Sequence, residues 1–144
     1  MIKNERQYRI TKAQAENFCQ TIAELKSSQS QGTHPVLRKA QREALKSQLA
    51  DLQRELREYE RLRAGKQKIV ALGSLEELPK TLIQARIISG LSQEALAAKL
   101  GLKPQQVQRY EATEYRSASL ERVTEVARVL GVKLRQPAEI RLAS

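Results

Sequence analysis

The sequence predicts an all-α protein, in which a long antiparallel helical hairpin or coiled coil is followed by a compact domain of four to five short helices. Hydrophobic residues make up 40% of the chain, whereas aromatic residues make up only 3% and tryptophan is absent. The core must therefore consist of Leu, Ile, Val and Ala, a composition that suits helices. Apolar residues also recur at helical steps of three and four, over long stretches in the first half and short ones in the second.

The first helix is predicted to start near Thr11, because Gln14 follows it at capping-box spacing. The small polar stretch 27–34 predicts a loop, and Pro35 suits the first turn of the next helix. The apolar stripe of this first helix is Ala15, Phe18, Ile22 and Leu25.

The second helix is predicted over residues 35–63, the longest periodic segment. Charges of both signs around its apolar seam favour a solvated, self-supporting helix over a binding stripe. Neither helix can bury its stripe alone, so the two pack on each other or on a second copy. The seam alternates steps of four and three, as in coiled coils: Leu45, Leu49, Leu52, Leu56 and Tyr59.

Residues 64–77 are predicted to form a hinge, because glycines interrupt the pattern at both ends. The apolar run 69–72 inside it fits either a short strand or a helix end. In the tail, residues 132–134 and 140–142 are candidates for two short strands, which could pair between two copies.

Four short helices are predicted from Leu78 onward. Ser92 and Ser119 are natural N-caps for the second and fourth, and the third runs from Pro104 to Glu111 with Val107 and Tyr110 facing inward. Ala97 and Gly101 are small where a tight turn between helices brings backbones close. The stripes of the first and fourth helices are Leu82, Ala85, Ile87 and Ile88, and Leu120, Val123, Val126, Ala127 and Leu130.

The third short helix exposes amide and guanidinium groups: Gln105, Gln106, Gln108 and Arg109. A side-chain amide matches the donor and acceptor edge of adenine, and the arginine fork matches guanine. Lys and Glu are the common choices where only solubility matters. This composition therefore indicates base contacts.

The chain carries 26 Lys and Arg against 16 Asp and Glu, a net charge of +10. Such an excess predicts a polyanionic partner, either nucleic acid or an anionic membrane surface. Residues 1–68 hold 15 of the basic and 8 of the acidic groups, so most of the excess lies outside the segment with the base-contact pattern.

Several classes of protein are excluded because the sequence lacks the features that they require. No apolar run approaches the roughly 18 residues of a membrane-spanning helix, and the N-terminus has no signal-peptide pattern. The single cysteine, Cys19, excludes an intrachain disulfide and a cysteine-based zinc finger, and favours a cytoplasmic location. His34 is a loop residue without other metal ligands near it, and no catalytic constellation is present. We expect no enzyme activity, cofactor, metal or membrane partner.

The segment Ser92–Leu102, SQEALAAKLGL, followed by VQRYE at 107–111, resembles the XRE family of Cro- and cI-type helix-turn-helix regulators. The resemblance covers residues 78–131 and implies a lambda-repressor-like DNA-binding domain, which we place at 78–134. Together with the helical pattern it gives a hairpin at 1–66, a linker at 67–77 and a tail at 135–144.

Carried over position by position, the resemblance implies base readers at Gln105 and Arg109, with Gln106 nearby. It implies phosphate contacts at Gln93, Lys103 and Arg116. The remaining implied site residues are Ser92, beside the DNA, and a structural pair formed by Arg86 and Glu111.

Three positions depart from the family pattern. Lys103 replaces the usual Ser or Thr cap of the recognition helix, and Pro104 replaces a polar reader. The loop 112–116 lacks the usual glycine.

The resulting hypothesis is a sequence-specific regulator of double-stranded DNA, a repressor whose homodimer reads successive major grooves. The hairpin would mediate dimerisation or partner binding. Two alternatives share the fold: a HigA-type antitoxin that neutralises a toxin and represses its own operon, and a coactivator similar to multiprotein bridging factors. A purely structural coiled-coil adaptor leaves the second half unexplained.

Overall fold

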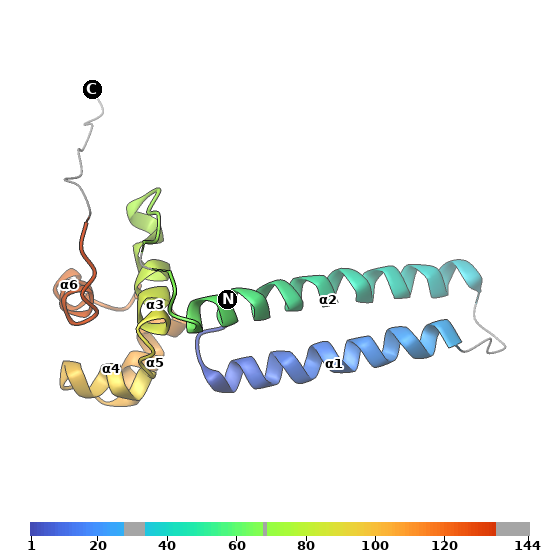
Figure 1. Ribbon diagram of the computed structural model, residues 1–144, viewed down its shortest axis with the longest axis horizontal. Helices are drawn as coiled ribbons and strands as arrows, with labels where there is room; N and C mark the ends of the chain where they lie inside the picture. Colours follow the sequence, from blue (N-terminus) through green and yellow to red (C-terminus); the bar gives the residue numbers. More distant parts are fainter. Residues whose placement is uncertain (28–33, 68, 135–144) are drawn as a thin grey trace, which may run out of the picture. The chain divides into compact units, whose positions relative to one another are not determined.

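A computed structural model of the chain describes residues 1–27, 34–67 and 69–134, and these residues contain helices and connecting segments but no strand. The chain divides into two compact units, Met1–Ala64 and Gly65–Ser144 (Figure 1). Within the described residues, no helix has both the length and the apolar character needed to cross a bilayer. The all-α prediction is confirmed.

The first unit is an antiparallel pair of helices, α1 (Glu5–Ser27) and α2 (Pro35–Arg63). Aromatic stacking joins the start of α1 to the end of α2, because the rings of Tyr8 and Tyr59 lie 5.4 Å apart between centroids. The Tyr8 hydroxyl donates a hydrogen bond to Glu60 at 2.6 Å. The predicted loop at 27–34 falls largely on residues 28–33, outside the described part of the chain.

The start of α1 lies earlier than the sequence pattern predicted, so the prediction of a start at Thr11 is wrong. Asn4 caps the helix instead, accepting a hydrogen bond from the Gln7 N–H at 2.9 Å. The Gln7 side chain in turn accepts from the Lys3 N–H at 2.8 Å. Ile2 is buried, so the chain packs from its second residue and the helix extends to meet it. Thr11 is an interior helix residue.

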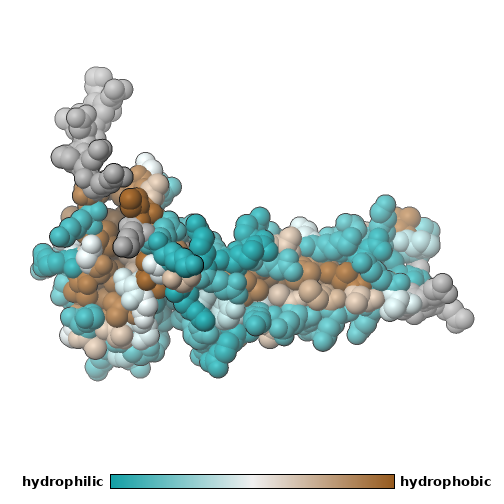
Figure 2. Space-filling view, viewed as in Figure 1, coloured by the Kyte–Doolittle hydropathy of each residue, from teal (hydrophilic) through white to brown (hydrophobic). Residues whose placement is uncertain are grey.

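The seam of α2 is only partly covered by α1. Tyr59 and Leu62 are buried at the end of the helix that the aromatic pair closes. On the face shown in Figure 2, apolar side chains gather between the two helices and hydrophilic side chains flank them. Ile10, Val36 and Leu37 are exposed apolar residues of the hairpin. The four leucines of the predicted seam remain half-buried: Leu45, Leu49, Leu52 and Leu56.

The second unit is a cluster of short helices. Residues 69–72, which fitted either a strand or a helix end, form neither. The core is built from side chains that are at most 1% exposed: Leu82, Ile83, Leu96, Val107 and Val126. Its elements are η1 (Leu75–Glu77), α3 (Leu78–Ile88), α4 (Gln93–Leu100), α5 (Pro104–Ala112) and α6 (Leu120–Val129).

Two features of this unit differ from the predicted stripes. Leu120 is the first residue of α6 and is 79% exposed, so its assignment to the core is wrong. Ile83, which the predicted stripe of α3 omitted, is fully buried. Residues 132–134 form no strand, and the second candidate strand at 140–142 lies outside the described residues.

Candidate nucleic-acid interface

The turn between α4 and α5 is fixed by local hydrogen bonds. The Ser92 hydroxyl oxygen caps α4 by accepting from the Ala95 N–H at 3.0 Å. At the other end, Gly101 has φ 66°, and the Leu102 N–H donates to the Ala97 carbonyl at 2.9 Å. A Cβ at Gly101 would meet nothing within 4 Å. Glycine is therefore needed here for its left-handed backbone, not for close approach as we expected, whereas Ala97 is fully buried.

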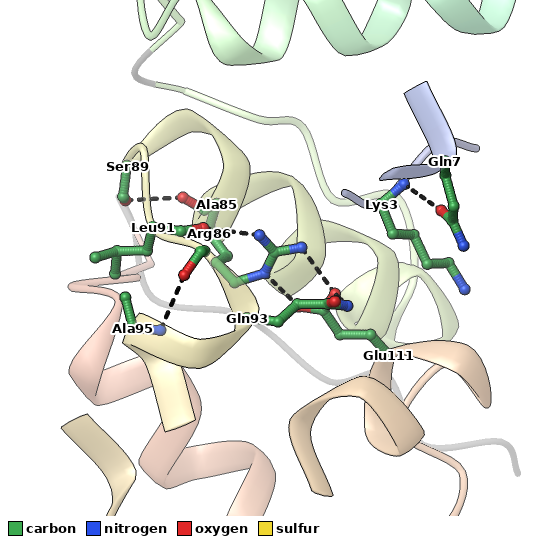
Figure 3. A network of polar contacts seen from close by, with 10 residues as sticks. Lys3, Gln7, Ala85, Arg86, Ser89, Leu91, Gln93, Ala95 and Glu111 are labelled. Carbon is green, nitrogen blue, oxygen red and sulfur yellow. Dashed lines mark hydrogen bonds and ion pairs between the residues drawn. The ribbon is translucent and has the colours of Figure 1, made fainter. Parts of the chain in front are cut away.

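A buried carboxylate holds three helices together (Figure 3). Glu111 on α5 accepts two hydrogen bonds from the Arg86 guanidinium on α3, from Nε at 2.5 Å and from Nη2 at 2.8 Å. The Gln93 amide on α4 donates to the same carboxylate at 2.7 Å. Arg86 Nη1 also donates to the Leu91 carbonyl at 2.8 Å, which anchors the turn between α3 and α4. Because the charges are paired and hydrogen-bonded, their burial is tolerated.

This network determines which face of α5 points outward. Val107 and Glu111, at 1% and 0% exposure, define the inward face. Gln105 and Arg109 are four residues apart on the opposite side and are both exposed. Gln106 and Gln108 flank them, also exposed. The outward face of α5 therefore presents amide and guanidinium donors on a backbone that the core holds in place.

The start of α5 is capped from within the helix. The Lys103 N–H donates to Gln106 Oε1 at 3.0 Å, and the Gln106 N–H donates to the Lys103 carbonyl at 2.9 Å. The Lys103 ammonium cannot accept a hydrogen bond, so it provides no side-chain cap. The side-chain oxygen of Gln106 accepts this capping bond, so the side-chain NH₂ group is the part of the amide left to donate to a ligand. Pro104 occupies the first helical turn, where its missing N–H costs nothing.

Residues 82–136 match the family described as helix-turn-helix. The second unit contains a helix-turn-helix domain of the XRE type. No curated protein and no solved structure matches the chain. The family is one of DNA-binding transcription regulators, and in these general terms the chain is a DNA-binding regulator of transcription.

Within the helix-turn-helix domain, most of the implied contact residues lie at the surface. Ser92, Lys103 and Arg116 are exposed, as are the implied readers on α5. Gln93, for which the resemblance implied a phosphate contact, is 6% exposed, and its amide donates to Glu111. The structure thus places Gln93 in the interior network, where its bond positions α4 against α5.

The loop after α5 achieves its turn without glycine. Glu114 and Tyr115 have φ 49° and 57°, so two consecutive residues adopt the left-handed conformation. The Tyr115 ring is buried and stacks against Tyr110 at 6.1 Å between centroids, which holds the loop in this shape. Burial raises the pKa of the Tyr115 phenol above its usual value. Its hydroxyl has no hydrogen-bond partner among the described residues.

The same loop forms an open depression beside the end of α5, lined by Ala112, Thr113, Glu114, Arg116 and Ser117. The Thr113 and Ser117 hydroxyls lie 3.1 Å apart in it. Sequence reasoning singled out Arg116 and missed these two hydroxyls. Their proximity depends on the left-handed backbone between them, which no spacing pattern signals.

Proposed function

We propose that the protein is a sequence-specific repressor that binds double-stranded DNA as a homodimer, with α5 of each copy in a major groove. The observation that carries this proposal is the outward face of α5, where Gln105 and Arg109 are exposed opposite the buried Val107 and Glu111. The major groove of B-DNA admits a helix, and there each base pair presents a distinct pattern of donors and acceptors.

Each exposed group has a distinct role in this complex. Arg109 donates both arms of its guanidinium to a guanine edge, and Gln105 pairs its amide with an adenine edge. Gln106 contributes donors only, because its oxygen caps α5. Lys103 and Arg116, exposed before and after α5, contact phosphates and fix the orientation of the helix.

The hairpin, residues 1–66, serves as the dimerisation element in this proposal. Its half-buried leucine seam, Leu45 to Leu56, leaves apolar surface that a second hairpin would cover. A two-fold symmetric dimer places two recognition helices on half-sites about one turn, 34–36 Å, apart.

Selection of bound sequences from a random duplex pool tests the proposal. We expect enrichment of a nearly palindromic sequence with half-sites about one helical turn apart. Enrichment of a single unpaired half-site would contradict the homodimer. Binding without any enriched sequence would contradict specific readout and would favour the coactivator alternative.

A further inference from the structure

A row of basic side chains follows α2 along its outer side. Lys39, Lys46, Arg57 and Arg61 are separated by seven, eleven and four residues, each close to a whole number of helical turns. All four are exposed. Half-buried Arg42 lies beside Lys39 and Lys46, at steps of three and four. We call these five residues the basic row.

The acidic residues of α2 neutralise little of the basic row. Asp51, Glu55 and Glu58, at steps of four and three, follow a different side of the helix. Asp51 pairs with Arg54, and Glu55 binds the N-terminal amino group at 3.2 Å. These three carboxylates therefore contribute little to neutralising the basic row.

Glu43 and Glu60 are the acidic residues that lie along the row, and the carboxylate of Glu60 accepts a hydrogen bond from the Tyr8 hydroxyl. Glu43 is the one that contacts basic groups of the row. It pairs with Lys46 at 3.1 Å and lies 3.7 Å from Arg42 Nε. Lys39, Arg57 and Arg61 have no ion-pair partner within residues 1–27, 34–67 and 69–134. Five basic groups against two acidic groups, Glu43 and Glu60, leave a net positive surface.

The other helix of the hairpin offers no comparable surface. Arg6, Arg9 and Lys12 on α1 follow one another at steps of three, so their positions turn progressively around the helix. The hairpin therefore carries its extended line of positive charge on α2.

We propose that the basic row binds the phosphate backbone of double-stranded DNA, independently of sequence. From Lys39 to Arg61 the row spans about 33 Å at 1.5 Å per residue, close to the roughly 34 Å of one turn of B-DNA. The inference rests on the proposed function, because it takes the partner to be the duplex to which the helix-turn-helix domain binds. The row would release condensed counterions and make binding steeply salt-dependent.

The test measures how the dissociation constant of the full-length protein for a random-sequence duplex varies with salt concentration. The row variant carries Lys39→Gln, Lys46→Gln, Arg57→Gln and Arg61→Gln, in which glutamine keeps the helix propensity. The matched control removes the same charge from exposed residues of α1, through Arg6→Gln, Arg9→Gln, Lys12→Gln and Lys26→Gln.

We expect the slope of log affinity against log salt to become shallower by about 0.9 for each lost phosphate contact, or about 3.6 for the row variant. The α1 control should change the slope much less. Equal slopes for the two variants, or a row variant with the wild-type slope, would overturn the proposal. Variants carrying only the Lys39 and Lys46 changes, or only the Arg57 and Arg61 changes, should each give about half the effect. These twofold variants still test the proposal if the fourfold variant folds poorly.

Two further measurements separate this proposal from its alternatives. The Arg109→Ala variant should lose sequence preference but keep the wild-type slope of log affinity against log salt, because its basic row is intact. Failure of base readout and failure of the row can therefore be told apart. Vesicles containing phosphatidylserine provide the second measurement. A row variant that loses vesicle binding but keeps the wild-type DNA slope would assign the surface to membranes and overturn the proposal.

Discussion

Arg86 and Glu111 form a buried ion pair through two hydrogen bonds, which join α3 to the recognition helix α5. Their side chains are 3% and 0% exposed. Because Glu111 lies on the opposite side of α5 from Arg109, the pair sets the rotation of the helix that presents the proposed base readers. If α5 reads bases as proposed, stability and DNA recognition depend on the same contact.

Replacing Glu111 with Ala should destabilise the second unit by about 3–5 kcal/mol, because it leaves the Arg86 guanidinium buried without its partner. Urea denaturation followed by circular dichroism measures this loss. The double variant Arg86→Met/Glu111→Leu should recover much of it, since buried pairs can often be replaced by apolar side chains of similar size. A loss below about 1 kcal/mol for Glu111→Ala would show that the pair is not buried as described.

Gln93→Ala should cost about 1.5–3 kcal/mol of stability, because a hydrogen bond to the charged Glu111 is removed. The DNA affinity of the folded protein should stay unchanged if the amide acts within the core. The control is Gln108→Ala, an exposed glutamine of α5 whose loss should leave stability unaltered. A Gln93 variant with wild-type stability but weakened DNA binding would restore the phosphate role implied by the family resemblance.

The long periodic segments were predictable from sequence because the apolar spacing of a helix does not depend on its partners. Start and end signals were less informative. Thr11 and Gln14 have capping-box spacing, yet tertiary packing of Ile2 extends α1 back to Glu5. Leu120 continues the apolar step pattern of α6, but at the first helical position it points into solvent.

In the candidate site, too, local sequence spacing predicted some features, whereas others depend on how the helices pack. The existence of α5 and its exposed polar face followed from local spacing and from the family resemblance. The resemblance also implied the structural pair of Arg86 and Glu111. The inward bond of Gln93 was not predicted, because Gln93 and Glu111 lie 18 positions apart and meet only when α4 packs on α5. The contact of Glu55 with the N-terminal amino group likewise could not be predicted, because the two groups are 54 positions apart in the sequence.

Glu114→Gly should stabilise the protein by about 0.5–1 kcal/mol, because glycine adopts a positive φ without the steric cost that a Cβ brings. The denaturant midpoint measures the effect. Glu114→Gln is the matched control, since it removes the charge but keeps the Cβ. If the glutamine variant gained as much stability as the glycine variant, charge rather than backbone conformation would be the cause.

Tyr115→Phe should leave stability unchanged or raise it by about 1 kcal/mol near neutral pH, because the buried hydroxyl has no partner among the described residues. Burial raises the folded-state pKa of this phenol above its unfolded value of 10. The unfolded state therefore loses the proton first as the pH rises, and the stability of the wild type falls above about pH 10.

Denaturant titrations at neutral pH and above pH 10 measure this dependence for the wild type and for Tyr115→Phe. The advantage of the variant should grow as the pH rises through the ordinary pKa of tyrosine. A difference between the two proteins that stays constant with pH would show that the phenol is accessible to water.

The most direct test of the central claim, that α5 reads bases, is the affinity of Arg109→Ala for the selected sequence and for random duplex DNA. We predict a loss of about 1–3 kcal/mol on the selected sequence, almost no change on random DNA, and an unaltered circular dichroism spectrum. Equal weakening on both duplexes, or undiminished discrimination between them, would contradict base readout by this helix.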